Sequence, residues 1–358
     1  MMNNMKSNKL PVLLIIVLMS ACNVFLETDP GNGPKEIFDS IWNDFNETYA
    51  LFDVRGIDWA QEYKTYSRKI HADTSDYQLF LICADMLNSL NDAHVKLITP
   101  YGNSDILGGP VNQNALNLQS IRDRLKNRGV FVGDDMFLYG TFSAKPKVGY
   151  IYIRSFLAGK VDLAYGPIQA WAEEIDGIIQ SLANTDYIIL DIRDNRGGLG
   201  SNAEYIAARF ASVQKDYIKV CTKNGPGRND FSVPIPYTVR PAGTRYTKPI
   251  VLLTNEQTVS AAERFTLAMR TQRHVIHAGE STSGAFSTKI RRPLINGWEY
   301  SMSVQKITDI DGNCYEGTGI APYEGHRIEE QERQLNYALT ILNFGDVRGV
   351  EGSFKIIF

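Results

Sequence analysis

PIVLLTNEQTVSAAERFTLAMR, residues 249–270, joins a continuous apolar run to a segment with helical spacing. Residues 249–254 have the pattern of a strand that is buried on both faces of a sheet, and a helix is expected from about Ala261 to Arg270. Strands that alternate with helices predict an α/β core with a mostly parallel sheet. Two similar strand–helix units precede this one: 148–154 with 161–182, and 187–192 with 202–211.

The chain on either side of this core has a different pattern. Two apolar stripes at helical spacing, Ile37 to Tyr49 and Tyr77 to Leu90, predict a small helical domain with a further helix between them. A strand over 298–305 and a closing helix over 328–342 are expected near the other end. The expected divisions are a signal peptide 1–21, a tether 22–33, a helical N-terminal domain 34–97, a connecting or lid region 98–145, an α/β domain 146–345 and a C-terminal tail 346–358.

The composition is that of an ordinary globular protein. Of the 358 residues, 44% are hydrophobic and 22% are charged, and 37 Lys and Arg stand against 40 Asp and Glu, for a net charge of -3. A basic surplus that would favour nucleic acid is absent from the sequence, and so is an acidic block typical of a disordered tail. No nucleic-acid partner is expected.

The first residues have the pattern of a targeting segment. Lys6 and Lys9 precede a short apolar run over 11–19, and Ser20 and Ala21 stand directly before Cys22. The run is shorter than the roughly 20 apolar residues of a membrane span. The arrangement resembles a bacterial lipoprotein signal in which Cys22 is lipidated, and an outer-membrane anchor on the periplasmic or outer side is expected. A plain signal peptide cut nearby, or a buried strand, is the alternative.

The three other cysteines do not form a recognisable metal or redox motif. Cys83, Cys221 and Cys314 lie far apart in the sequence, and no pair has the spacing of metal ligands. They are expected to be buried small hydrophobic residues. Neither a metal nor a cofactor is predicted.

The first candidate site lies at the end of the strand over 187–192. The segment from Asp191 to Gly198, DIRDNRGG, ends in two glycines. Paired glycines at a strand-to-helix turn allow backbone N–H groups to face a ligand, as an oxyanion hole requires. The alternative is a tight turn in which Asp191 and Arg193 form a structural ion pair.

The second candidate site is Ser260, which stands where the helix over 261–270 begins. The N-terminus of a helix favours negative charge, and the N–H of Ala261 could hold an oxyanion beside a serine nucleophile. Ser260-Ala-Ala-Glu263 also has the pattern of a capping box, in which Ser260 only caps the helix. The local pattern does not choose between these interpretations.

A serine nucleophile needs a base, and His94 is the best placed of the five histidines. It lies in Leu90-Asn-Asp-Ala-His94, where a helix gives way to a short apolar stretch, so its side chain could face a cleft. The alternative is a structural histidine.

Five segments together resemble the tail-specific, or C-terminal processing, serine protease superfamily over about residues 36–342. The resemblance implies a crotonase-like (ClpP/crotonase) spiral core of the α/β class beside the small helical domain. The five segments are LNDAH (90–94), DIRDNRGG (191–198), TVSAAE (258–263), GESTSG (279–284) and EGTGIAP (316–322).

The superfamily has two catalytic styles, and this chain resembles the one of the tricorn core and the interphotoreceptor retinoid-binding protein repeats. The Ser/Lys style has a lysine where this chain has Ala285, and the stretch between residues 97 and 148 is too short for its PDZ module. In the tricorn-like style, Ser260 is implied as the nucleophile, and Gly198 and Ala261 as the oxyanion donors.

The same resemblance implies the other members of the catalytic set, with one departure. His94 matches the histidine and Glu316 the glutamate of the tricorn-like style. Ala93 stands where that style has its second serine, so a water or Asp92 would have to orient His94. Lys289 is an alternative source of a lysine base.

The function implied is that of a serine peptidase that hydrolyses peptides or unfolded proteins at the cell envelope. Such substrates could bind as an added strand. Two alternatives stay open. The first is a binding protein without catalysis on the same fold, and the second is a hydrolase of other esters or amides.

Overall fold

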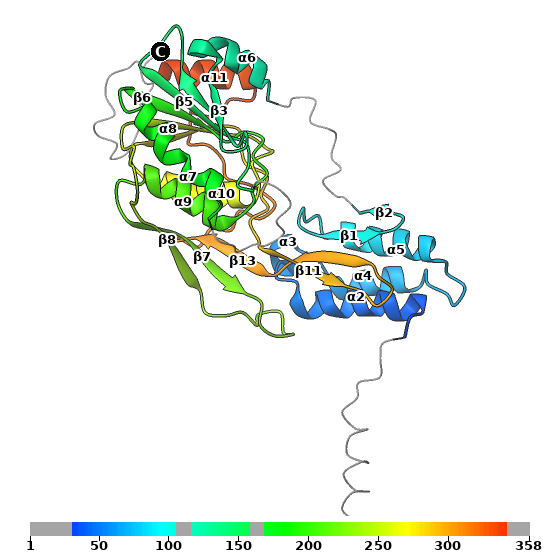
Figure 1. Ribbon diagram of the computed structural model, residues 1–358. Helices are drawn as coiled ribbons and strands as arrows, with labels where there is room; N and C mark the ends of the chain where they lie inside the picture. The colour runs from blue at the N-terminus through cyan, green and yellow to red at the C-terminus, as the bar shows by residue number, and fades with distance from the viewer. Residues whose placement is uncertain (1–30, 105–115, 158–167, 342–358) are drawn as a thin grey trace, which may run out of the picture.

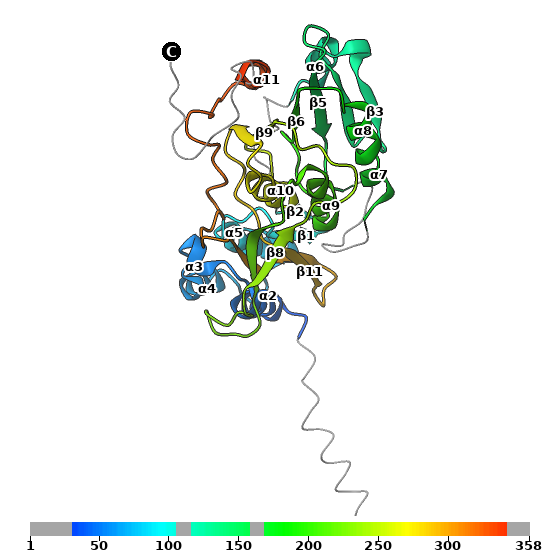
Figure 2. The same cartoon turned by 90° about the vertical axis from the view of Figure 1, so that its left-hand side faces the viewer.

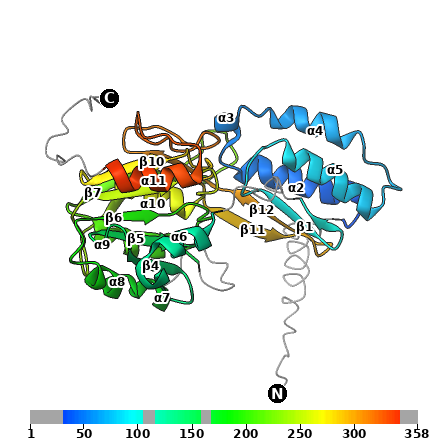
Figure 3. The ribbon, with the colours of Figure 1, turned by 90° about the horizontal axis from the view of Figure 1, so that it is seen from above.

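The computed structural model describes residues 31–104, 116–157 and 168–341. Cys22, the expected signal peptide and the expected C-terminal tail lie outside the described residues. The described chain is a mixed α/β structure with several sheets, and its elements fall into two parts that Figure 3 shows side by side.

The larger part is organised around a six-stranded sheet. The four strands at one side are parallel and the last two are antiparallel, which agrees with the expected mostly parallel sheet. Their order is β10 (Val275–Gly279), β9 (Ile250–Thr254), β6 (Tyr187–Asp191), β5 (Val148–Ile153), β4 (Phe137–Thr141) and β3 (Val130–Val132).

Both faces of this sheet are covered, as its apolar strands require. In β9, Ile250 and Leu252 pack into one core, while Val251 and Leu253 pack into another, because side chains of a strand alternate between its faces. One face carries α7 (Ala170–Glu173), α8 (Ile175–Ser181), α9 (Gly200–Phe210) and α10 (Ala261–Arg270), and the other carries α6 (Leu118–Arg124) and α11 (Gln331–Thr340) (Figure 1).

The stretch expected to connect two domains contributes to the large sheet instead. In its described part, β3 and β4 extend the sheet beyond β5, and α6 and the short 3₁₀ helix Lys126–Arg128 precede them in the chain. The turn between β3 and β4 contains Gly133, Asp134 and Asp135, all with positive φ. Gly and Asp adopt this conformation most easily, so Gly133-Asp-Asp135 between apolar runs was a usable hairpin signal.

The smaller part contains the N-terminal helices α2 (Pro34–Thr48), α3 (Phe52–Arg55), α4 (Trp59–Ser67) and α5 (Asp76–Asn88). They pack on a four-stranded antiparallel sheet that the sequence interpretation did not anticipate. Two of its strands come from the far end of the chain, and Tyr300 packs against Phe45 with ring centroids 5.6 Å apart. The order is β11 (Lys289–Pro293), β12 (Glu299–Ser303), β1 (Lys96–Thr99) and β2 (Gly102–Asn103).

A third sheet links the two parts. It contains β13 (Gln305–Asp309), β7 (Lys215–Thr222) and β8 (Ile235–Val239), and Figure 2 shows β8 between α9 and α2. Only Val304 separates β12 from β13, so the single strand expected over 298–305 serves two sheets. The loop after β7 reaches the small part, where the Arg228 guanidinium lies 4.0 Å from the centre of the Phe52 ring.

Candidate active site

Ser260 lies in a strained turn between β9 and α10. Its backbone has φ 62° and ψ -120°, which falls in the left-handed half of the map that a residue with a side chain rarely enters. Such strain persists only where neighbours hold it, and here the preceding N–H of Val259 donates to the carbonyl of Asn195 at 3.0 Å. A sharp strained turn before a helix is the way that serine nucleophiles are presented in other α/β enzymes.

The first turn of α10 has the expected capping box, in which the Ser260 side chain faces the Glu263 N–H and the Glu263 side chain faces the Ser260 N–H. The N–H of Ser260 donates to Glu263 Oε2 at 2.9 Å, which is one half of the expected capping box. The N–H of Glu263 donates to the carbonyl oxygen of Ser260 at 2.9 Å, so the backbone already satisfies it. The capping box therefore fits both interpretations of Ser260, and only the strained backbone of Ser260 favours the nucleophile interpretation.

The glycine turn expected to form an oxyanion hole lies directly against Ser260. Gly197 has φ 82°, and a Cβ there would stand 2.9 Å from both Ser260 Cβ and the Ala261 nitrogen. Gly198 has φ 142°, and a Cβ there would stand 2.3 Å from the carbonyl carbon of Phe156. Only glycine fits either position, because a side chain would collide with backbone or with the serine.

The peptide groups of this turn are held from both sides. The N–H of Phe156 donates to the carbonyl of Gly197 at 2.8 Å, and the N–H of Leu199 donates to the carbonyl of Phe156 at 3.0 Å. Within the described residues, the N–H groups of Gly198 and Ala261 donate to no acceptor. An oxyanion hole requires backbone N–H donors that are fixed beside the serine and have no acceptor of their own.

The same segment also contains the structural ion pair that was the alternative interpretation. Arg193 Nε donates to Asp191 Oδ1 at 2.9 Å, and both side chains are fully buried. Arg193 Nη1 donates to the carbonyl of Gln331 at 2.8 Å and so ties β6 to α11. Both interpretations therefore describe part of the segment: its first half is structural, and its glycines face Ser260.

His94 lies in the smaller part, in the loop between α5 and β1, and no hydrogen bond joins its side chain to Ser260 within the described residues. Its N–H donates to Asp92 Oδ1 at 2.9 Å, and its carbonyl accepts from Ser301 Oγ at 2.7 Å. The pairing of Lys96 with Ser301 places β1 beside β12 and fixes the loop. The imidazole is buried, and its Nδ1 has no hydrogen-bond partner among the described residues.

The surroundings of His94 keep its imidazole neutral at pH 7. Burial lowers its pKa to about 4, the charge of Asp92 raises it, and the charges of Lys289, Arg264 and Arg55 lower it further. Arg264 lies one turn after Ser260 in α10, so its charge acts on the imidazole from the nucleophile's own helix. A neutral imidazole is the form that can accept a proton.

Glu316 is held by other groups than His94. Its Oε1 accepts from the N–H groups of Phe286 at 3.0 Å and Ser287 at 2.6 Å, and its Oε2 accepts from Arg55 Nη2 at 3.3 Å. Burial raises its pKa to about 8, and the charge of Asp92 raises it as well, while Arg55 lowers it. No hydrogen bond joins Glu316 to His94 within the described residues.

Asp92 interacts with His94 more directly than Glu316 does. It is fully buried, and it accepts from the His94 N–H and from Tyr49 Oη at 2.9 Å. Among the neighbouring charges, that of Asp92 acts most strongly on the His94 pKa. Asp92 was one of the two groups expected to orient the imidazole in place of a serine at position 93, but its hydrogen bond is to the backbone.

Arg55 and the wider role of Glu263 were missed at the sequence level. Arg55 ends α3 and donates both to Glu316 and to the carbonyl of Asn91, so it links the His94 loop to the Glu316 loop. Nothing in the local sequence marks an arginine in a four-residue helix. The capping-box pattern accounts for only one of the four hydrogen bonds that Glu263 accepts.

Ala285 stands where the Ser/Lys style has its lysine, and only its backbone takes part in the hydrogen bonds near Ser260. Ala285 is buried, and its N–H donates to Glu263 Oε2 at 2.9 Å. Lys289 begins β11, and its charge lowers the pKa of His94. The other buried or half-buried histidines bond elsewhere: His277 Nε2 to Thr254 at 2.7 Å, His274 Nε2 to the Phe210 carbonyl at 3.0 Å, and His326 Nδ1 to Tyr337 at 2.7 Å.

The described residues contain no group of three or more His, Cys, Asp or Glu side chains that could hold a metal ion. No helix in the same ranges is both long and apolar enough to span a membrane. Cys83 is buried, and burial raises the pKa of its thiol to about 12, which makes it a poor nucleophile.

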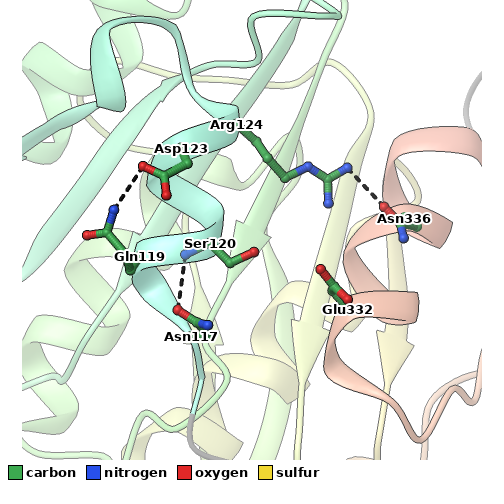
Figure 4. Close-up of a pocket in the computed structure, with 7 residues that line it drawn as sticks. All are labelled: Asn117, Gln119, Ser120, Asp123, Arg124, Glu332 and Asn336. Carbon is green, nitrogen blue, oxygen red and sulfur yellow. Dashed lines mark hydrogen bonds between the residues drawn. The ribbon is translucent and has the colours of Figure 1, made fainter.

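A polar hollow lies between α6 and α11, on the opposite face of the six-stranded sheet from α10 (Figure 4). Arg124 crosses it and donates to Asn336 Oδ1 at 2.9 Å. None of the side chains proposed for catalysis lines it. Its lining residues are Asn117, Gln119, Ser120, Asp123, Arg124, Glu332 and Asn336.

Comparison with known proteins places this geometry in a family. Residues 147–324 match the sequence model of "Peptidase family S41", and residues 30–88 match that of the "Tricorn protease C1 domain". Carboxy-terminal processing protease CtpA of Bacillus subtilis is 30% identical over 153 residues, and CtpB of the same organism is 25% identical over 176 residues. These alignments cover 42% and 49% of this chain, but only 31% and 33% of the two relatives.

A solved structure agrees over more of the chain. A candidate peptidase from Parabacteroides merdae superposes with a TM-score of 0.72 at 26% identity, over 84% of this chain and 90% of that one. With the strained serine and the glycine turn beside it, these matches show that the chain belongs to peptidase family S41.

Proposed function

We propose that this protein is a serine peptidase in which Ser260 is the nucleophile and His94 the general base. The observation that carries the proposal is the strained Ser260 turn, packed against Gly197 and beside the unspent N–H groups of Gly198 and Ala261. Family membership supports the same reaction, the hydrolysis of peptide bonds. The family's relatives are processing proteases by name, and that activity is proposed for this chain.

The proposed reaction is acyl transfer to water. His94 removes the proton of Ser260 as Oγ attacks the peptide carbonyl, and the N–H groups of Gly198 and Ala261 hold the oxyanion. His94 then protonates the leaving amine, and a water molecule releases the acyl group by the reverse sequence. The neutral state of the buried imidazole at pH 7 supports its role as base.

We assign Asp92 the support of the imidazolium that forms on His94. Its carboxylate is the strongest charged influence on the imidazole, and it raises the His94 pKa, which is the direction that stabilises a protonated histidine. Glu316, which is bonded to Arg55 and two backbone N–H groups, would act on His94 less directly. Its place in the catalytic set remains a prediction.

We further propose that the core is a crotonase-like spiral and that the chain acts at the cell envelope as a lipoprotein anchored through Cys22. The parallel β10–β9–β6–β5 arrangement with helices on both faces supports the fold assignment. The charged and apolar pattern before Cys22 supports the anchor. Peptides or unfolded proteins are the proposed substrates, and no cofactor or nucleic acid is required by this reaction.

A binding protein without catalysis is the second candidate. The buried Nδ1 of His94 without a partner, together with Ala93 and Ala285, favours this alternative, because an imidazole whose tautomer is not fixed is a poor base.

The test is mass spectrometry of a denatured-protein peptide mixture after incubation with residues 23–358 or with the same chain carrying Ser260→Ala. New peptide termini made by the wild type alone are expected. Identical, uncut mixtures in the two samples would overturn the peptidase proposal and favour the binding protein.

A further inference from the structure

Glu263 is a fully buried carboxylate whose four hydrogen bonds all come from neutral donors. Its Oε2 accepts from the N–H groups of Ser260 and Ala285, each at 2.9 Å. Its Oε1 accepts from the N–H of Gly284 and from Thr282 Oγ1, each at 2.7 Å. Buried carboxylates are usually paired with a cation, and no salt bridge to Glu263 forms within the described residues.

These four bonds join the nucleophile turn to a loop that is itself tightly placed. A Cβ on Gly284 would stand 2.7 Å from the nitrogens of Thr318 and Gly319, and the Gly284 carbonyl accepts from the Gly317 N–H at 2.7 Å. The same loop continues into the two N–H groups that bind Glu316. Glu263 therefore links the Ser260 turn to the Thr282–Ala285 loop. A movement of this loop would also disturb the two N–H groups that bind Glu316.

The chemistry of the four donors requires a carboxylate at this position. An ionised carboxylate offers about four acceptor sites and no donor, which matches four converging N–H and O–H groups. A glutamine of the same shape would point an NH₂ group at two of those donors. The strained peptide of Ser260 would then lose one of the bonds that hold it.

We infer that Glu263 is a positioning residue for catalysis: its carboxylate holds the strained Ser260 peptide against the Thr282–Ala285 loop and so aims Ser260 Oγ and the Ala261 N–H at the scissile carbonyl. The inference rests on the proposed peptidase function. It predicts that Glu263 changes the rate of acylation and leaves substrate binding nearly intact, because its side chain is buried and cannot reach a substrate.

The experiment compares Glu263→Gln with the wild type, with Ser260→Ala and with Asp176→Asn as a matched control. Asp176 on α8 also accepts four hydrogen bonds, from Arg209 Nε and Nη2, Tyr205 Oη and the Thr244 N–H, and none of these groups touches Ser260. The rate of covalent labelling by a fluorophosphonate, kcat and KM on a cleaved peptide, and thermal unfolding are measured for each protein.

We expect Glu263→Gln to lower both the labelling rate and kcat by about 100-fold, the size of effect that a small misplacement of a reacting group produces, with KM changed by less than about threefold. Asp176→Asn should keep wild-type labelling even where its unfolding temperature falls. If Glu263→Gln is poorly folded, Thr282→Val serves in its place with an expected loss of about tenfold in labelling; it removes one donor to Glu263 and also the acceptor of the Ile320 N–H.

The outcomes separate this inference from the function on which it rests. Wild-type labelling that disappears in Ser260→Ala, together with unchanged labelling in a folded Glu263→Gln, would overturn the positioning role alone. Equal losses in kcat for Glu263→Gln and Asp176→Asn would also overturn it, since both would then reflect stability. Absence of any Ser260-dependent labelling in the wild type would overturn the proposed function itself.

Discussion

The nucleophile side and the base side of the site differ in how completely their polar groups are bonded. Around Ser260, the peptide, the capping carboxylate and the glycine turn are all held by short hydrogen bonds within the larger part. Around His94, the backbone is fixed, but the imidazole Nδ1 has no partner among the described residues. The nucleophile side is therefore preorganised by the fold, whereas His94 is fixed through its backbone and not through its imidazole Nδ1.

The largest effect that tests this comparison is the loss of the base. His94→Ala should lower kcat/KM by about 10³-fold, within the range for a general base, in a protein that remains folded. Peptide hydrolysis and circular dichroism check the two statements. Retention of more than a tenth of the activity would mean that another group, such as Lys289, removes the proton.

The preorganisation around Ser260 can be tested by adding a side chain to its glycine turn. Gly197→Ala places a methyl group 2.9 Å from Ser260 Cβ and the Ala261 nitrogen, so kcat should fall by about 10²-fold, the cost of losing one oxyanion donor. Gly200→Ala is the matched control, because a Cβ there meets no atom within 4 Å. Similar rates for both variants would show that the turn tolerates displacement and does not hold an oxyanion.

The roles of the two carboxylates near His94, Asp92 and Glu316, can be distinguished by replacing each in turn. Asp92→Asn should lower kcat by about 10²-fold if Asp92 supports the imidazolium, whereas Glu316→Gln should cost less. Tyr49→Phe, which removes the other donor to Asp92, controls for damage to the buried network. A larger loss for Glu316→Gln would assign the supporting role to Glu316, as the family resemblance implies.

The two sides should also differ in the pH dependence of activity. His94, with a pKa of about 4, is already neutral at pH 5, whereas burial raises the pKa of Glu263 to about 7 against its four hydrogen bonds. Of the charged groups nearby, Glu316 is coupled to Glu263 by charge repulsion, and the Arg264 side chain is turned to the Phe286 carbonyl.

Wild-type kcat should therefore fall by about tenfold from pH 8 to pH 6 as Glu263 takes up a proton, since a tenfold change per pH unit below the pKa is the limit for one group. The Glu263→Gln variant should not show this decrease in kcat between pH 8 and pH 6, although its kcat is lower at every pH. A wild-type rate that stays constant down to pH 5 would contradict a requirement for ionised Glu263.

The smallest expected effect concerns stability. Burial raises the pKa of Glu316 to about 8, above its unfolded value, so the folded chain binds this proton more tightly and the free energy of unfolding should decrease as the pH rises from 6.5 to 8. Glu263 acts in the same direction below about 7. His94, whose pKa is lowered, has the opposite effect only below about pH 6.5.

Thermal unfolding at several pH values between 6.5 and 8 measures this slope. Glu316→Gln should make it shallower, and Glu329→Gln, at an exposed position, should leave it unchanged. An identical slope in wild type and Glu316→Gln would mean that Glu316 is ionised throughout the range.

Most of the larger part could be predicted from the sequence, because its signals are local. The buried apolar strands of 187–192 and 249–254, and the helix that follows Ser260, depend on runs of neighbouring residues. The capping-box pattern also correctly indicated that Ser260 and Glu263 interact. What it could not indicate is that Glu263 accepts three further hydrogen bonds from a loop about twenty residues away.

The smaller part could be predicted only in its helices. Its four-stranded sheet combines β1 with β11 and β12, which lie about two hundred residues later in the chain, and such pairings leave no local pattern. The hairpin of β3 and β4 had a turn signal at Gly133 and Asp134, but the surrounding Pro, Gly and Asn residues favoured a connecting region. Arg55 contacts Glu316 because of how the smaller part packs, and no local sequence pattern predicts this contact.

The sequence by itself determined the α/β class of the core, the serine at a strand-to-helix turn and the pair of glycines, because each depends on residues that are close together along the chain. Tertiary structure alone decided that Gly197 lies against Ser260, that β12 pairs with β1 beside the His94 loop, and that the charges of Arg55 and Asp92 act on His94. The physical reason is that hydrogen bonds and charge interactions in a catalytic site act over a few ångströms in space, whatever the separation of the residues in sequence.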